Sequence, residues 1–144
     1  MADDAAERRR ELTERAEFHA QAQRRRSEEE SAKAQLLIDR FVAQATQFGL
    51  PTEELTARPW SGTGRYRTGV VGWYLRANRS VGVSVDGGYY LLNVPPVWFG
   101  RWRTVHLAPT PPPLVVGKGA GDGEVFDLDV LLLKRLQWPD SGRA

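Results

Sequence analysis

The chain has 144 residues, a length typical of one domain, and its 41% hydrophobic content with a mean hydropathy of −0.46 allows a modest core. It contains no cysteine, which excludes a disulfide framework, a cysteine-based zinc site and thiol catalysis. The formal net charge is +2, but residues 58–103 carry seven arginines against one acidic residue, whereas residues 1–48 carry nine basic and ten acidic residues. The central part of the chain is therefore the basic part.

The N-terminal sequence has no apolar segment of the kind that a secretory signal requires. Apolar runs such as Val130–Leu133 are much shorter than the roughly 20 residues of a membrane span. We therefore expect a soluble, cytoplasmic protein without a membrane partner.

Residues 3–48 contain neither proline nor glycine and are rich in helix-forming residues, which predicts a long N-terminal helix. Residues 1–33 have few large apolar side chains, so we expect them to form a charged helical arm beside a single domain at residues 34–144. Ser27 and Glu30 match a capping box, at which the helix can break and restart. The arm is either a coiled coil or a free, partly disordered helix. A stripe of small residues on one face is compatible with a close-packed helix–helix seam, but an alanine-rich helix also produces such stripes by chance: Ala16, Ala20, Ser27, Ser31 and Ala34.

From Ala34 the helix gains a broad apolar face. Leu37, Phe41, Ala45 and Phe48 recur at helical spacing, which predicts that this half packs on a sheet. Gly49 then ends the helix.

Residues 65–94 contain three strand-like runs separated by two turns, which predicts an antiparallel three-stranded meander. Asp86-Gly87 predicts a two-residue hairpin turn that pairs Val83 with Tyr90. A turn of two or four residues before Val81 pairs Tyr74 with Val83. A three-residue turn there would exchange the faces of the first strand.

With the even-numbered turns, the valines of the second strand lie on the face that the N-terminal helix covers. The opposite face is also apolar and needs cover from another element or another molecule. It carries five large apolar side chains: Val71, Trp73, Leu75, Tyr89 and Leu91.

The rest of the chain completes an α+β domain with a sheet of three to five strands. Residues 97–103 form an aromatic and arginine-rich cluster, and residues 104–107 are a candidate fourth strand. Residues 124–138 have an amphipathic pattern that predicts a C-terminal helix.

No catalytic motif is present. His19 and His106 lie in different predicted elements without a metal-ligand spacing, and the glycine-rich stretches 61–64 and 117–123 lack the pattern of a phosphate-binding loop. We expect a non-enzymatic protein without a cofactor or a bound metal.

These observations favour a small binding or adaptor protein that associates with itself or with a protein partner. The predicted contact residues are Val71, Trp73, Leu75, Tyr89, Leu91, Trp98 and Trp102. The alternative is a nucleic-acid-binding module, because arginines interleaved with aromatic residues are typical of single-strand binding surfaces. Its candidate residues are Arg65, Arg67, Arg76, Arg79, Arg101 and Arg103.

Overall fold

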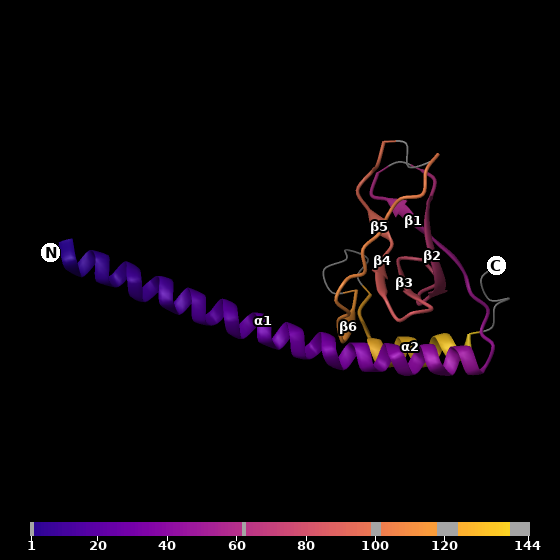
Figure 1. Cartoon of the computed structure of the whole chain (residues 1–144), viewed down its shortest axis with the longest axis horizontal. Coiled ribbons are helices and arrows are strands. Elements are labelled where there is room, and N and C mark those ends of the chain that lie inside the picture. The colour runs from indigo at the N-terminus through magenta and orange to yellow at the C-terminus, as the bar shows by residue number, and fades with distance from the viewer. Residues whose placement is uncertain (1, 62, 99–101, 118–123, 139–144) are drawn as a thin grey trace.

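The computed structural model describes residues 2–61, 63–98, 102–117 and 124–138, which form an α+β fold (Figure 1). The elements are α1 (Ala2–Gln47), β1 (Glu53–Pro59), β2 (Tyr66–Tyr74), β3 (Val81–Ser84), β4 (Tyr89–Leu91), β5 (Asn93–Val94), β6 (Val115–Val116), β7 (Phe126–Asp127) and α2 (Leu128–Gln137). The main sheet has the strand order β4-β3-β2-β1-β5, and β6 pairs with β7 in a separate two-stranded sheet. All pairings are antiparallel except that of β1 with β5.

Helix α1 is a single helix of 46 residues without a break at Ser27. Its N-terminal part projects away from the rest of the protein, and residues 2–29 are exposed except for the half-buried Ala22 (Figure 1). Glu30 does not close a capping box, because its carboxylate accepts a hydrogen bond from the backbone N–H of Leu114 at 3.0 Å. This contact marks the point where the helix joins the folded body.

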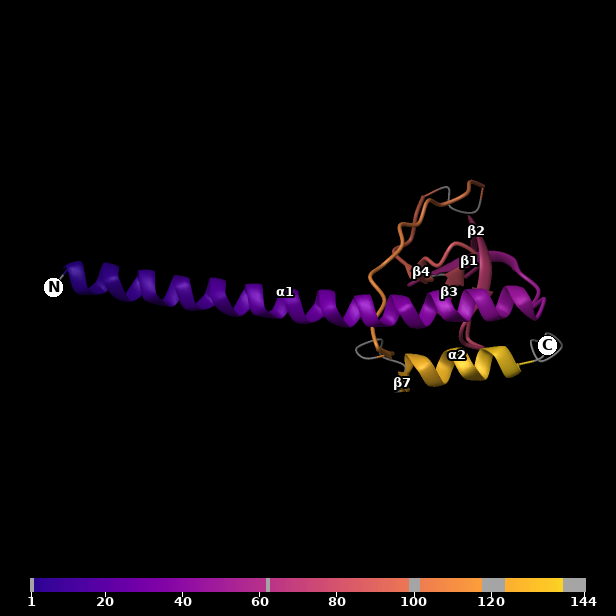
Figure 2. The same ribbon diagram turned by 60° about the horizontal axis from the view of Figure 1, so that its bottom comes forward.

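The second half of α1 and the shorter α2 lie side by side beneath one face of the sheet (Figures 1 and 2). Ala34, Ile38, Phe41 and Ala45 of α1 are buried there, whereas Phe48, which the sequence placed on this stripe, is 68% exposed. The stripe ends one turn earlier than predicted, because the chain turns into β1 through Gly49, whose φ is +69°.

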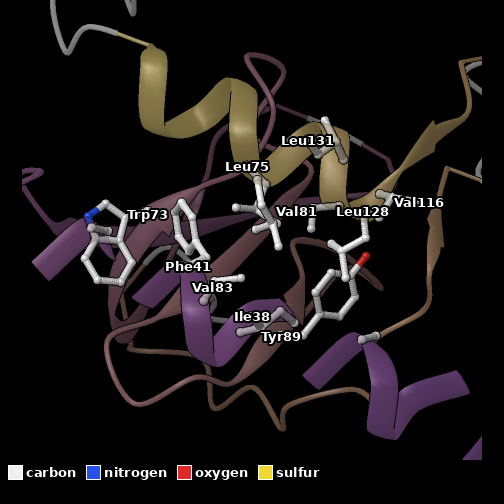
Figure 3. Packing of buried hydrophobic residues seen from close by; sticks show 13 residues of the cluster. Ile38, Phe41, Trp73, Leu75, Val81, Val83, Tyr89, Val116, Leu128 and Leu131 are labelled. Atoms are coloured by element: carbon white, nitrogen blue, oxygen red, sulfur yellow. The ribbon is translucent and has the colours of Figure 1, made fainter. Parts of the chain in front are cut away.

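The main core lies between the two helices and the sheet (Figure 3). Trp73 packs edge-to-face on Phe41 with ring centroids 5.6 Å apart, and its indole N–H donates to the carbonyl of Leu50 at 3.0 Å. The sheet contributes five buried side chains to this core: Trp73, Leu75, Val81, Val83 and Tyr89.

The predicted division of the sheet into faces is therefore wrong. Val83 pairs with Trp73 on one side and with Tyr89 on the other, so the valines share the helix-covered face with the aromatic residues. Both connecting loops contain an odd number of residues, 76–80 and 85–87, and each shifts the register by one position. A shift of one residue turns every side chain of a strand to the other face.

The backbone conformation and hydrogen bonds of the β3–β4 turn explain why it has three residues and not the predicted two. Gly87 adopts a φ of +92°, as in a three-residue loop that ends in a left-handed residue. The Ser84 hydroxyl donates to the Asp86 carboxylate and accepts from the Gly88 N–H at 2.9 Å. The hydrogen bond from Ser84 lowers the pKa of the Asp86 carboxyl below its ordinary value.

The opposite face of the sheet carries a second apolar cluster of Leu55, Tyr74 and Leu92. The segment that follows the predicted aromatic cluster covers it, with Leu107 packed against these side chains. This segment is not the predicted strand at 104–107, because it has no regular secondary structure. Isolated backbone hydrogen bonds hold it to the sheet, from Val105 N to Arg67 O and from Thr110 N to Tyr89 O, both 2.7 Å.

The sequence prediction missed β1, in which polar residues alternate with the buried Leu55, Ala57 and Pro59. Two prolines near the ends of this segment and its short apolar side chains conceal the strand pattern. The parallel pairing of β1 with β5 brings two chain segments that are far apart in sequence to the same end of the sheet.

Helix α2 begins at Leu128 and not at residue 124, because Phe126 and Asp127 form β7 against β6. Leu128, Leu131 and Leu132 of the predicted apolar face are buried. Val125 and Leu133, which the pattern also placed on this face, are each 57% exposed. The acidic Asp129 lies in the first turn and two basic residues lie in the last turn, as the helix dipole favours.

Candidate interaction surfaces

The seven predicted contact residues do not form one surface. Trp73, Leu75 and Tyr89 belong to the core, each no more than 2% exposed, because the helices cover their face. Val71 and Leu91 are about half exposed, but they lie on β2 and β4, which β3 separates. The remaining two, Trp98 and Trp102, are 82% and 76% exposed. They lie in the loop after β5, at the end of the sheet away from the helices (Figure 1).

A third tryptophan lies at the same end of the sheet. Trp60 directly follows β1 and is 71% exposed, and its backbone N–H donates to the carbonyl of Val94 in β5 at 2.9 Å. The phenol of Tyr66 accepts a hydrogen bond from the Val97 N–H at 3.1 Å and so attaches the second loop to β2. We call this end the tryptophan tip and define it by four exposed apolar residues: Trp60, Val97, Trp98 and Trp102.

Trp60 was not among the predicted contact residues. Its aromatic side chain next to Pro59 was visible in the sequence, but its position beside the second loop depends on the parallel pairing of Pro59 with Val94. No short-range sequence signal predicts that pairing, since the two residues belong to strands that are not consecutive.

The candidate nucleic-acid-binding arginines are divided between two regions. Arg65 and Arg67 lie near the tryptophan tip, where Arg65 donates to the Thr56 carbonyl at 2.8 Å and Arg67 forms an ion pair with Glu54 at 3.1 Å. Arg103 is exposed in the loop that carries Trp102. Arg101 lies outside the described residues.

Arg76 and Arg79 belong to the loop between β2 and β3. Arg76 is buried, forms an ion pair with Glu124 at 3.1 Å and lies over the ring of Phe126 at 5.3 Å. Arg79 lies over the ring of Tyr74 at 5.6 Å. The five candidate arginines that the structure describes therefore do not line one continuous platform.

A pocket of about 410 Å³ opens beside Arg76, between the β2–β3 loop and α2. One wall is Arg135, which is only 2% exposed and donates from Nε to the carbonyl of Tyr74 at 2.7 Å. Its guanidinium also lies over the Trp138 ring at 5.1 Å. The hydrogen bond from Arg135 to Tyr74 anchors α2 to the sheet.

A smaller groove of about 290 Å³ runs between α1 and α2. Leu37 and Phe41 line one side, and Val130, Leu133 and Leu136 line the other. Val130 and Leu133 are 40% and 57% exposed, so this groove presents an apolar strip at the opposite end of the protein from the tryptophan tip.

The histidine, aspartate and glutamate side chains of the described residues do not gather at one site. Within the ranges that the structure describes, no group of three or more histidine, aspartate and glutamate side chains is placed to hold a metal ion. His19 lies on the projecting part of α1 and His106 in the segment that covers the second sheet face. Of the glycine-rich stretches, residues 62 and 118–123 lie outside the described part of the chain.

A scan of protein-family models, a search of curated proteins and a search of solved structures each found no match to this chain. No helix among the described residues combines the length and the apolar character that crossing a bilayer requires. Inferences about function therefore depend on the surfaces described above.

Proposed function

We propose that this chain is a small, non-enzymatic binding or adaptor protein, homo-oligomeric, which contacts a protein partner through the tryptophan tip. The observation that carries the proposal is the exposure of Trp60, Trp98 and Trp102 at one end of the sheet. Tryptophan is among the residues that contribute most to the affinity of protein interfaces, and exposed apolar clusters commonly mark such sites.

The loops of the tip have fixed attachments. The Trp60–Val94 backbone hydrogen bond attaches the first loop to β5, and the Tyr66–Val97 hydrogen bond attaches the second loop to β2. A surface that is ordered before binding loses less conformational entropy on association. The exposed Arg103 beside Trp102 favours a partner whose apolar contact region has an acidic rim.

Self-association is assigned to the helical end. Leu36, Val130 and Leu133 are 66%, 40% and 57% exposed there, on helices that lie at the far end of the sheet from the tip. A protein with two separated contact regions can hold a second copy and a partner at the same time, which is what an adaptor requires.

The test is affinity capture from an extract of the native host with the immobilised full-length protein. We expect at least one protein to be retained by the wild type and lost with the double variant Trp98→Ala/Trp102→Ala. Val125→Ala is the matched control. Val125 is 57% exposed, but it directly precedes β7 and lies far from the tip. Identical captured proteins with and without the two tryptophans would contradict a tip-mediated contact.

The alternative function, nucleic-acid binding, is favoured by one observation. The basic region 58–103 includes both the tryptophan tip and its neighbouring arginines, and exposed aromatic side chains next to arginine can stack on single-stranded bases. Binding of a labelled single-stranded oligonucleotide would then fall steeply between 50 and 200 mM salt, roughly as expected for released counterions. No binding at the lower salt concentration rules this alternative out.

A further inference from the structure

The outer face of α1 carries a regular seam of residues that are exposed except for the half-buried Ala22. In the docked half, Ala34 and Ile38 face the sheet. Leu36 is two positions from each of them, about 200° around the helix, and is 66% exposed. Positions spaced alternately by three and four residues continue this outer face along the helix, which is the spacing of a coiled-coil seam. We call these positions the outer seam: Arg15, Phe18, Ala22, Arg25, Glu29, Ala32, Leu36 and Asp39.

The order of residues along the outer seam is self-complementary when read in opposite directions. An antiparallel second copy, related by a two-fold axis level with position 27, places Phe18 opposite Leu36 and Ala22 opposite Ala32. The same axis places Arg25 opposite Glu29 and Arg15 opposite Asp39. Apolar residues therefore meet apolar residues, and each charge meets an opposite charge.

Other arrangements of two copies lose this match. A parallel, in-register pair places Arg25 opposite Arg25 and Glu29 opposite Glu29. An antiparallel pair shifted by one heptad places Glu29 opposite Phe18 or Arg25 opposite Leu36. Like charges in contact, or a charge facing an apolar side chain, disfavour these pairings.

The fold leaves space for this pairing. The sheet and α2 pack on the buried face of the docked half of α1, and Leu36 remains 66% exposed. At the end of the seam, Asp39 accepts a hydrogen bond from Gln35, whose side chain also donates to the carbonyl of Gly87 in the β3–β4 turn. Phe18 is 63% exposed on the projecting part of the helix. From Arg15 to Asp39 the seam extends about 36 Å at 1.5 Å per residue.

We propose that a second copy of this chain binds along the outer seam of α1, antiparallel, to form a two-fold symmetric dimer. The projecting arm of each copy covers the exposed Leu36 of the other, and the two tryptophan tips lie far apart. This inference rests on the homo-oligomeric part of the proposed function, for which it assigns the contact, and it does not depend on the tip. A two-fold contact of this kind closes on itself and does not lead to filaments.

The first test exchanges charges at the central layers, with mass measured by light scattering after size exclusion. We expect the wild type to have about twice the monomer mass of 16.2 kDa. In a dimer of Arg25→Glu, or of Glu29→Arg, positions 25 and 29 of the two copies carry like charges at both of their contacts. We therefore expect the dissociation constant of each variant dimer to rise at least about tenfold. In a 1:1 mixture, a dimer of one Arg25→Glu chain and one Glu29→Arg chain again has opposite charges at both contacts, so we expect the dimer to form.

Arg24→Glu is the matched control, because position 24 lies about 100° from the seam and the charge change is the same. Circular dichroism verifies that each variant is folded. If Arg25→Glu leaves the dimer intact, copies meet elsewhere, so the seam is wrong while the homo-oligomeric proposal stands. If the wild type is a monomer at every concentration, both are wrong.

The second test determines orientation, and the absence of native cysteine makes it clean. Ala22→Cys and Ala32→Cys are prepared as separate variants and mixed under mild oxidation. We expect a disulfide between the two different variants. Preferential linking of Ala22→Cys to itself overturns the antiparallel arrangement.

Discussion

Gly72 is a position at which the sheet leaves no room for a side chain. A Cβ at this residue would collide with the backbone carbonyl of Val83 and lie 2.7 Å from the Cα of Ser84. Both obstacles are backbone atoms of β3, which cannot move without breaking the strand pairing.

We therefore expect Gly72→Ala to lower the free energy of unfolding by about 3 kcal/mol or more. Gly49→Ala is the comparison, because its Cβ would meet no atom within 4 Å and costs only the strain of its φ of +69°, about 1 kcal/mol. Urea unfolding followed by circular dichroism measures both, and equal losses would contradict the predicted collision.

Ionisation of the buried Tyr89 phenol should lower the free energy of unfolding at alkaline pH. Burial raises the pKa of its phenol from 10.0 to about 12, against an opposing effect of the Arg76 charge. The folded-state pKa lies above the unfolded-state value, so the contribution of the neutral phenol is complete below pH 10 and is lost as the pH rises towards 12.

The variant Tyr89→Phe keeps the buried ring and removes the ionisable hydroxyl. Between pH 9 and pH 11.5 we expect the wild type to lose about 1–2 kcal/mol more free energy of unfolding than the variant does. Denaturant titrations at the two pH values measure the difference, and parallel losses in both proteins would contradict it.

The long helix consists of two parts with different roles. Residues 2–29 are exposed except for the half-buried Ala22, and Glu30 begins the docked part through its hydrogen bond to Leu114. Packing of an apolar face supplies most helical stability in proteins, and this support is limited to the second half of α1.

Deletion of residues 1–29 should therefore leave the body folded, with a midpoint of thermal unfolding within a few degrees of the full chain at high dilution. The deletion should also abolish the dimer, since it removes Phe18, Ala22 and Arg25 from the outer seam. Calorimetry and light scattering measure the two effects. An unfolded fragment would show that the arm contributes to the stability of the body.

The sequence predicted the order of elements better than the relation between them. The Asp86-Gly87 pair identifies a turn, but the hydrogen bonds of Ser84 decide that it has three residues, and they depend on the folded geometry. The resulting register shift moves Trp73 and Tyr89 from a predicted contact surface into the core. By contrast, the exposed Trp98 and Trp102 lie in a proline-flanked loop, whose position outside the strands was predictable from local sequence.

The two proposed contact regions lie at opposite ends of the protein. The tryptophan tip is attached to β1, β2 and β5, whereas the outer seam lies on the side of α1 that faces away from the sheet. Binding at one region should therefore change affinity at the other only weakly, because no described element belongs to both.

We expect Trp98→Ala/Trp102→Ala to leave the dimer dissociation constant unchanged within about twofold, since sites this far apart with no shared contacts usually behave additively. Arg25→Glu should likewise leave capture by the tip unchanged. Sedimentation equilibrium and the capture assay measure these effects. Loss of the dimer in the tryptophan variant would show that the tip itself joins the copies.

The 46-residue helix also determines how the protein moves through solution. At 1.5 Å per residue it is about 70 Å long, whereas a compact chain of this size has a radius of gyration of about 15 Å. Friction increases with such elongation, so even a monomer should elute from a size-exclusion column well ahead of globular 16 kDa standards. A column calibrated with spherical proteins would report a dimer where there is none. In the proposed antiparallel pair the two helices overlap over most of their length, so the mass doubles while the long dimension hardly grows.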